Sequence, residues 1–166
     1  MIVVSDTSPL SGLAIVGKLP LLQAVYRQIV IPEAVAIELR RGGQDEPRIA
    51  QVLALSWVEI KPPTNHPLID ELQTIYKLDK GESEAIALAL ELNADALLID
   101  ERLGRREASR LGLAITGMLG VLLAAKKQTL VSAVRPIVDA LIKEAGFRIS
   151  SQLYREVMAA AGERAE

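Results

Sequence analysis

Short apolar runs, none longer than a buried strand, recur along the chain and are separated by stretches with the spacing of helices. The candidate strands lie at residues 2–4, 29–31, 57–60, 96–99 and 113–115. Strands that alternate with helices in this way predict parallel βαβ units with right-handed crossovers. We therefore expect an α/β fold with a central, mostly parallel sheet of four or five strands flanked by helices.

The composition agrees with that architecture. Half of the 166 residues are hydrophobic, but only 3% are aromatic, so the core must be aliphatic and rich in alanine. Such a core suits a parallel sheet covered by helices better than a sandwich or a barrel. The length fits one domain with a short appendage.

Charge and cysteine content exclude several classes of protein. The net charge of −2 gives no support for a duplex-binding protein, although a carboxylate-rich site would lower the total charge even beside a basic patch. The absence of cysteine excludes disulfides, thiol catalysis and zinc–thiolate sites. With neither a signal-peptide pattern nor an apolar run of about 18 residues, we expect a soluble, cytoplasmic protein without membrane contact.

Turn and capping residues predict where several helices begin and end. A helix that opens at Pro32 is expected to stop at the glycine pair 42–43. Ser132 is expected to cap a later helix, and Ser150 or Ser151 to cap the last one.

Acidic residues follow two of the predicted strands, Asp6 after the first and Asp100 and Glu101 after the fourth. The carboxyl ends of parallel strands share one edge of the sheet, where ligands gather. Residues far apart in the sequence can therefore converge there. A simpler reading makes Asp6 and Asp100 ordinary helix caps.

Three more acids lie on predicted helices. Glu38 lies within the second helix, and Glu82 and Glu84 open a later one, where they would also interact well with the helix dipole. Clustered carboxylates repel one another unless a cation lies among them. Oxygen ligands favour a hard divalent ion, so Mg²⁺ or Mn²⁺ is the expected cofactor of such a cluster.

Four segments, in order, resemble the motifs of PIN domains. They are VVSDTSPL at 3–10, IPEAVAIEL at 31–39, GESEAIALA at 81–89 and LLIDER at 97–102. The resemblance covers about residues 1–125 and implies a three-layer PIN-like fold. It divides the chain into a nuclease domain at 1–130 and a helical extension at 131–166 that packs on the same domain.

The resemblance also implies the site. Its catalytic and metal-binding residues would be Asp6, Glu38, Glu84 and Asp100. Two alternatives stay open, because Glu82 competes with Glu84 and another register makes Glu101 the fourth ligand in place of Asp100. Thr7 and Ser8 are candidate supporting residues, through hydrogen bonds to the aspartate or to a bound water.

The implied function is metal-dependent endonucleolytic hydrolysis of single-stranded RNA. The motifs also resemble those of prokaryotic PIN-like proteins grouped with VapC-like toxins, which implies a cognate antitoxin and a homodimer. Arg102, Arg105 and Arg106 are candidate RNA contacts, although a solvated helix face that pairs with Glu101 and Glu107 is the more frequent explanation of such a cluster.

Two other function classes remain for comparison. A catalytically degenerate PIN-like domain would act as a protein-interaction module, and the Glu at position 84, where most PIN domains carry Asp, favours it. A dehalogenase-type phosphatase would use Asp6 as a nucleophile but would carry a second Asp where this chain has Ser8. The amphipathic tail at 147–161 either packs on its own domain or mediates dimerisation or antitoxin docking.

Overall fold

A parallel five-stranded sheet lies at the centre of the protein. The computed structural model describes residues 1–165, and its strands follow the order β3-β2-β1-β4-β5. Their bounds are β1 Val3–Ser5, β2 Ile29–Ile31, β3 Val58–Ile60, β4 Ala96–Leu98 and β5 Ile115–Thr116. All four strand pairs are parallel, so the predicted α/β class with its mostly parallel sheet is confirmed.

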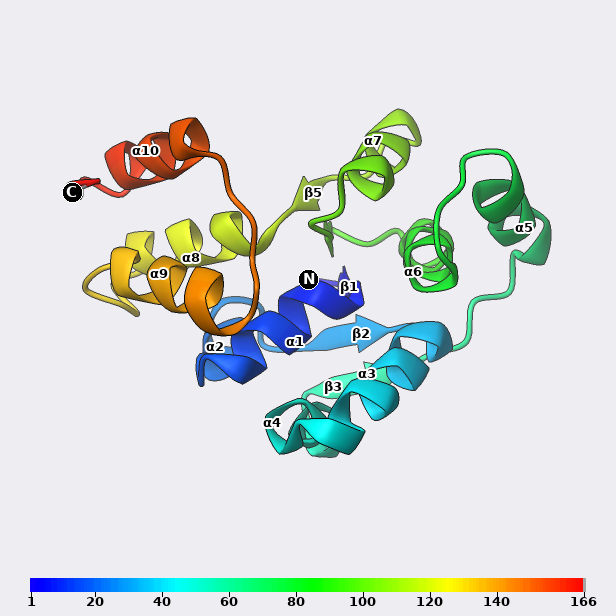
Figure 1. Cartoon of the computed structure of the whole chain (residues 1–166). Coiled ribbons are helices and arrows are strands. Elements are labelled where there is room, and N and C mark those ends of the chain that lie inside the picture. Colours follow the sequence, from blue (N-terminus) through cyan, green and yellow to red (C-terminus); the bar gives the residue numbers. More distant parts are fainter. Residues whose placement is uncertain (166) are drawn as a thin grey trace.

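Helices cover both faces of this sheet and complete a three-layer fold (Figure 1). The first helices are α1 Thr7–Ile15, α2 Pro20–Tyr26, α3 Glu33–Asp45, α4 Pro47–Ala50, the 3₁₀ helix η1 Gln51–Ala54 and α5 His66–Thr74. They are followed by α6 Lys80–Glu91, α7 Arg102–Arg110, α8 Met118–Lys127, α9 Arg135–Glu144 and α10 Ser151–Ala160.

The side chains of the strands alternate between two aliphatic cores. Val3 and Leu98 point into a core formed with α1 to α4 and α8 to α10. Val4 and Leu97 point into a second core formed with α5, α6 and α7. This alternation is what the period of two in a strand requires when both faces of the sheet are covered.

The strand order reverses beside β1, the central strand. The chain moves from β1 to β2 and β3 on one side, then returns to place β4 and β5 on the other side. The backbone N–H of Asp6 donates to the carbonyl of Leu98 over 2.9 Å, which joins the ends of β1 and β4. In open α/β sheets the crevice at such a reversal is the usual ligand site.

The predicted end of α3 at the glycine pair is wrong, because the helix continues through both glycines to Asp45. A Cβ atom at Gly43 would lie 2.8 Å from the Cα atom of Ala50 in α4. The glycine therefore allows two helices to pack closely. Close approach, rather than helix termination, accounts for this residue.

The predicted cap of α9 is also wrong, because the cap position is Val134 and not Ser132. The carboxylate of Glu163 accepts hydrogen bonds from the backbone N–H groups of Val134 and Arg135, over 2.8 and 3.1 Å. A residue distant in sequence therefore satisfies the helix end. Ser150, by contrast, does cap α10, through the N–H of Leu153 over 3.0 Å.

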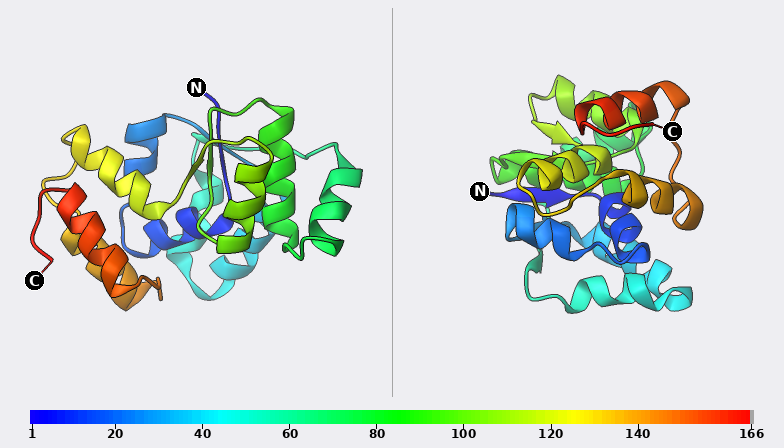
Figure 2. Two further views of the ribbon diagram at one scale, coloured as in Figure 1. Left: turned by 90° about the horizontal axis from the view of Figure 1, so that it is seen from above. Right: turned by 90° about the vertical axis from the view of Figure 1, so that its left-hand side faces the viewer.

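The C-terminal helices share the core of the preceding domain. Val138 and Leu141 of α9 and Val157 of α10 are buried in the core that contains β1 and α1. Figure 2 shows α9 and α10 at the opposite end of the molecule from α5. The division at 130/131 stays a prediction, and its last residue, 166, lies outside the described part of the chain. No helix within residues 1–165 is long and apolar enough to cross a membrane.

Candidate metal centre

Asp6 lies at the reversal of the sheet, between the end of β1 and the start of α1. Its side chain makes no capping hydrogen bond to the helix, although it occupies the cap position. The residue is only 6% exposed. Burial raises the pKa of Asp6 to about 7, the Thr7 backbone opposes that shift, and the charges of nearby acids add to it, Asp79 first. Asp6 is therefore a buried carboxylate among other carboxylates.

Glu38 reaches the same region from α3. The hydroxyl of Thr7 donates to Glu38 Oε2 over 2.5 Å, so Thr7 orients this carboxylate. Glu38 Oε1 lies so close to Gly81 of α6 that a Cβ atom there would overlap with it. Burial raises the pKa of Glu38, the Thr7 hydroxyl lowers it, and Asp79 raises it again.

Glu82 is held from the start of α6 by a capping box. Its Oε1 accepts from the backbone N–H of Asp79 over 3.0 Å, and Asp79 Oδ1 accepts from the N–H of Glu82 over 2.7 Å. The other oxygen, Glu82 Oε2, is buried and has no hydrogen-bond partner in the described chain. Burial raises the pKa of Glu82 to about 8, and among the nearby charges Asp79 and Asp6 add to the shift.

Asp100 follows β4 and faces the start of α8. Its Oδ1 accepts from the backbone N–H of Met118 over 2.9 Å. Its Oδ2 is the second buried oxygen without a partner among the described side chains. Burial raises the pKa of Asp100, while the Met118 hydrogen bond and the charge of Arg105 lower it. Asp100 in turn raises the pKa of Asp6.

Three glycines make room for three of these carboxylates. Gly81 faces Glu38, as described above. A Cβ atom at Gly104 would lie 3.1 Å from Glu82 Oε2, and one at Gly117 would lie 2.7 Å from Asp100 Oδ1. The three glycines belong to different segments of the chain, and at each one a larger side chain would collide with a carboxylate.

Glu84, which was predicted to be a metal ligand, points to the start of α3. Its Oε1 accepts from the backbone N–H of Ala34 over 3.0 Å, at the start of α3. The cap position of α3 is Pro32, which has no side-chain acceptor, so Glu84 supplies it from another helix. The charge of Asp6 raises the pKa of Glu82, whereas the carboxylate of Glu84 is bound to the start of α3. The geometry thus favours Glu82 as the third acid.

Glu101 also has a structural role. It caps α7, and its Oε2 accepts from the N–H groups of Leu103 and Gly104 over 2.6 and 3.2 Å. Its side chain is exposed, unlike that of Asp100. Of the two candidates for the fourth position, Asp100 is the one placed towards Asp6.

Asp79 was not predicted as a site residue, yet its charge raises the pKa of Asp6, Glu38 and Glu82. The sequence does carry a signal for its local role. An Asp three residues before a Glu, ahead of a helix-forming run, is the pattern of a capping box. No feature of the sequence alone predicted that Asp79 lies near Asp6.

The remaining predicted residues lie around the acids. Ser8 is exposed and lines a hollow that also contains Asp100. Arg105 Nη1 donates to the carbonyl of Ile99 over 2.8 Å, which holds the guanidinium beside Asp100. Arg102 and Arg106 are exposed on α7. An RNA contact by any of these arginines stays a prediction.

The donor set fits a hard divalent cation. Within residues 1–165 no three Asp, Glu or His side chains are already arranged as a metal site. Two buried oxygens nevertheless lack partners, and four neighbouring carboxylates have raised pKa values. A cation would supply the missing partner and reverse those shifts. Oxygen-only donors select Mg²⁺ or Mn²⁺ over softer metals.

The protein thus has a three-layer α/β fold with buried carboxylates at the reversal of its sheet. A family model described as a PIN domain matches residues 2–163. The chain therefore belongs to the PIN-domain family, whose members are generally metal-dependent nucleases. The match includes α9 and α10, beyond the roughly 125 residues over which the motifs were recognised. No curated protein matches the chain.

Proposed function

We propose that the protein is an endoribonuclease that hydrolyses single-stranded RNA with Mg²⁺ or Mn²⁺ held by Asp6, Glu38, Glu82 and Asp100. The observation that carries the proposal is the pair of buried oxygens of Glu82 and Asp100 that lack a partner in the described chain, both near enough to the buried Asp6 for their charges to interact with it. Leaving such oxygens unsatisfied is unfavourable in a purely structural site. A site built to take up a cation explains them.

The chain's own residues fix the geometry of this site. Thr7 orients Glu38, the Asp79 backbone orients Glu82, and the Met118 N–H orients Asp100. Each acid therefore offers one oxygen in a set direction. A bound divalent ion would supply the positive charge that lowers the pKa of an attacking water and neutralises the scissile phosphate.

The toxin assignment is a further part of the proposal and rests on the resemblance to VapC-like proteins. It implies a cognate antitoxin, a homodimer and a cytoplasmic location. A neighbouring gene for a small DNA-binding protein would support it.

Cleavage of labelled RNA tests the proposed activity. Purified protein is incubated with single-stranded RNAs in Mg²⁺, in Mn²⁺ and in chelator, beside the variants Asp6→Asn and Asp70→Asn. Asp70 is an exposed aspartate on α5 and serves as the matched control. We expect metal-dependent cleavage by the wild type and by Asp70→Asn, and its loss in Asp6→Asn.

A second candidate function is a PIN-like module that binds a protein without catalysis. The favouring observation is that no three carboxylates of residues 1–165 are already arranged around one point. Identical behaviour of the wild type and Asp6→Asn in all three conditions would support this module and reject the nuclease.

A further inference from the structure

The segment 146–149, which links α9 to α10, passes beside the proposed metal centre. We call it the strap; it is the orange segment between the two helices in Figure 1. Two hollows share its residues Phe147 and Arg148, and both also include Asp100. The strap therefore borders two surface hollows that also contain that acid.

The strap is anchored at its start and open beyond it. Gly146 has a φ of 68°, which favours glycine, and it turns the chain at the end of α9. The N–H of Phe147 then donates to the carbonyl of Leu141 over 3.0 Å. Phe147 is partly buried against the main core, whereas Arg148 is exposed. The ring is thus packed against the protein, and the exposed guanidinium can reach a ligand.

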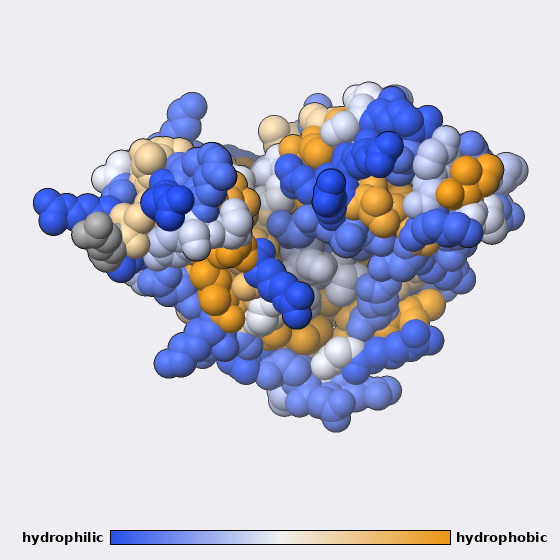
Figure 3. All heavy atoms as spheres, turned by 45° about the horizontal axis from the view of Figure 1, so that its top comes forward, coloured by the Kyte–Doolittle hydropathy of each residue, from blue (hydrophilic) through white to orange (hydrophobic). Residues whose placement is uncertain are grey.

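The larger of the two hollows has an apolar wall and a basic rim. Its volume is about 490 Å³, and β5, α8 and α10 contribute Ile115, Leu119, Leu123, Leu153 and Val157 to the lining. Arg105 and Arg148 bring positive charge beside Asp100. Figure 3 shows the surface hollowed between the part that carries α10, on the left, and the part that carries α7, at the upper right.

The smaller hollow is lined by the strap and by α1. Its volume is about 440 Å³, and Ser8, Ser11 and Gly12 of α1 and Glu101 contribute to its lining. It is more acidic, because Glu101 joins Asp100 there. A polyanion would therefore meet its cations on the larger hollow's side.

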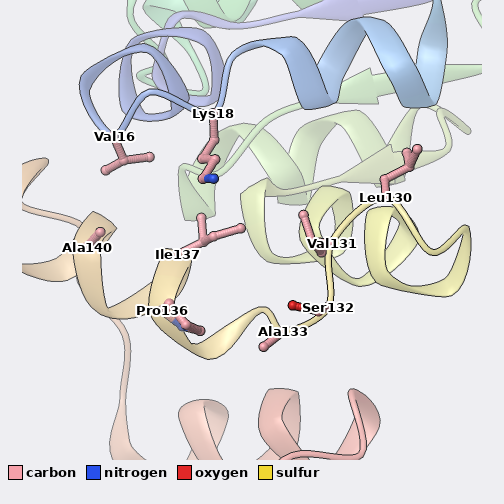
Figure 4. Close-up of a pocket in the computed structure, with 9 residues that line it drawn as sticks. All are labelled: Val16, Lys18, Leu130, Val131, Ser132, Ala133, Pro136, Ile137 and Ala140. Atoms are coloured by element: carbon pink, nitrogen blue, oxygen red, sulfur yellow. The ribbon is translucent and has the colours of Figure 1, made fainter.

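A third hollow of about 380 Å³ lies between the end of α1 and the start of α9, and Figure 4 shows its lining. It includes Lys18 but none of the acids of the metal centre. Nothing in the structure indicates what would cover it, and it is separate from the strap.

We propose that the strap and the larger hollow form a subsite for one unpaired nucleotide next to the scissile phosphate, with its base stacked on Phe147 and its phosphate bound by Arg148. The proposal rests on the proposed function and specifies how that site selects its substrate. Phe147 is the only phenylalanine of the chain and, among residues 1–165, the only aromatic residue that lines either hollow.

The chemistry of the subsite selects an unpaired nucleotide. A base can stack on a side chain only when it has left its own helix, so an aromatic platform favours single strands. The hollow also lies within the range of about 300–1,000 Å³ that is typical of sites for small ligands. Because the acids repel a polyanion, binding needs a cation at the flanking phosphate, and Arg148 is placed to provide it.

The stacking contact is tested with Phe147→Leu, which keeps an aliphatic packing group, and with Phe147→Tyr, which keeps the ring. Steady-state cleavage is measured on a single-stranded RNA and on copies with an abasic residue on either side of the cleaved bond. We expect Phe147→Leu to raise KM by about 5- to 100-fold with little change in kcat, and Phe147→Tyr to restore KM. On the matching abasic copy, wild type and Phe147→Leu should have the same KM. Thermal unfolding of each variant checks that the fold is intact.

The phosphate contact is tested with Arg148→Ala, beside Arg155→Ala as the matched control. Arg155 is exposed on α10 and lines neither of the strap hollows. RNA binding is measured by fluorescence anisotropy against salt concentration, in Ca²⁺. Loss of one phosphate contact on a single strand should reduce the log–log salt slope by about 0.7 in Arg148→Ala, with no change in Arg155→Ala.

The outcomes separate this inference from the nuclease proposal. If the wild type cleaves RNA and the strap variants keep its KM and its salt slope, the subsite is rejected and the nuclease stands. If the wild type cleaves nothing, the nuclease is rejected, and the anisotropy arm still decides on the subsite. Equal binding by Phe147→Leu, Arg148→Ala and wild type would then overturn it.

Discussion

Glu82 and Glu84 lie two positions apart in α6 and have opposite surroundings. One oxygen of Glu82 is buried without a partner next to Gly104, whereas Glu84 accepts a hydrogen bond from Ala34. Two residues span about 200° around a helix, so they face opposite sides. We therefore propose Glu82 as the metal-binding acid of the two, while Glu84 supports the start of α3.

This assignment predicts opposite effects on stability. Glu84→Ala leaves a buried N–H without its acceptor and should lower the free energy of unfolding by about 1–3 kcal/mol. Glu82→Gln removes a buried charge and should stabilise the metal-free protein above pH 8, because the pKa of Glu82 is about 8. Urea unfolding in chelator measures both. A loss of stability in Glu82→Gln at that pH would contradict the assignment.

The sequence could not distinguish these two acids. Asp6 and Asp100 were predicted from their positions at strand ends, and the structure places both at the reversal of the sheet. In α6, however, the run from Gly81 to Ala89 is buried on every side. Without a polar face, periodicity cannot tell which side of a helix meets the end of the sheet.

Two glycines within helices give a second prediction. In Gly81→Ala the new methyl group would displace the Glu38 carboxylate, so metal affinity should fall by about tenfold or more. Gly42→Ala is the matched control, because its nearest contact outside α3 is an ordinary 3.5 Å from Ile49. Because Gly42 is an exposed helical residue, Gly42→Ala should raise the free energy of unfolding by about 0.5–1 kcal/mol. Calorimetric titration with Mn²⁺ and thermal unfolding measure the two effects.

The junction of α8, α9 and the chain end depends on Glu163. Besides capping α9, it forms an ion pair with Lys126 over 2.8 Å. Glu163→Ala should therefore lower the free energy of unfolding by about 1–3 kcal/mol. Glu156→Ala, an exposed residue of α10, should change it by less than about 0.5 kcal/mol. If Glu163→Ala lowers the free energy of unfolding by no more than Glu156→Ala does, the contacts of Glu163 contribute little to stability.

Predictions from the sequence failed mainly where two elements meet. Strands and most helices were predicted because their apolar spacing is local. In α3, Gly43 is required by the close approach of Ala50 and does not end the helix. The start of α9 is capped by Glu163, which lies 29 residues after the cap position, Val134. Local sequence patterns cannot predict contacts between residues that are far apart in the sequence.

For the whole molecule, the buried acids predict a dependence of stability on pH. The folded pKa values of Asp6 and Glu82, about 7 and about 8, exceed the ordinary values of 3.8 and 4.5. Between those limits the unfolded chain loses protons that the folded chain keeps, so stability is greatest at the acidic end and falls as the pH rises. The total loss should be on the order of several kcal/mol in chelator. Saturating Mn²⁺ should flatten the curve, and urea unfolding at pH 5 to 9 measures it.

The binding of Mn²⁺ at neutral pH, measured by calorimetry on the wild type and on Asp6→Asn, Glu82→Gln and Glu84→Gln, tests the metal centre most directly. We expect saturable binding by the wild type and by Glu84→Gln, with binding lost or at least tenfold weaker in Asp6→Asn and Glu82→Gln. A wild type that binds no Mn²⁺, or a Glu82→Gln variant that binds as the wild type does, would contradict the carboxylate site described above.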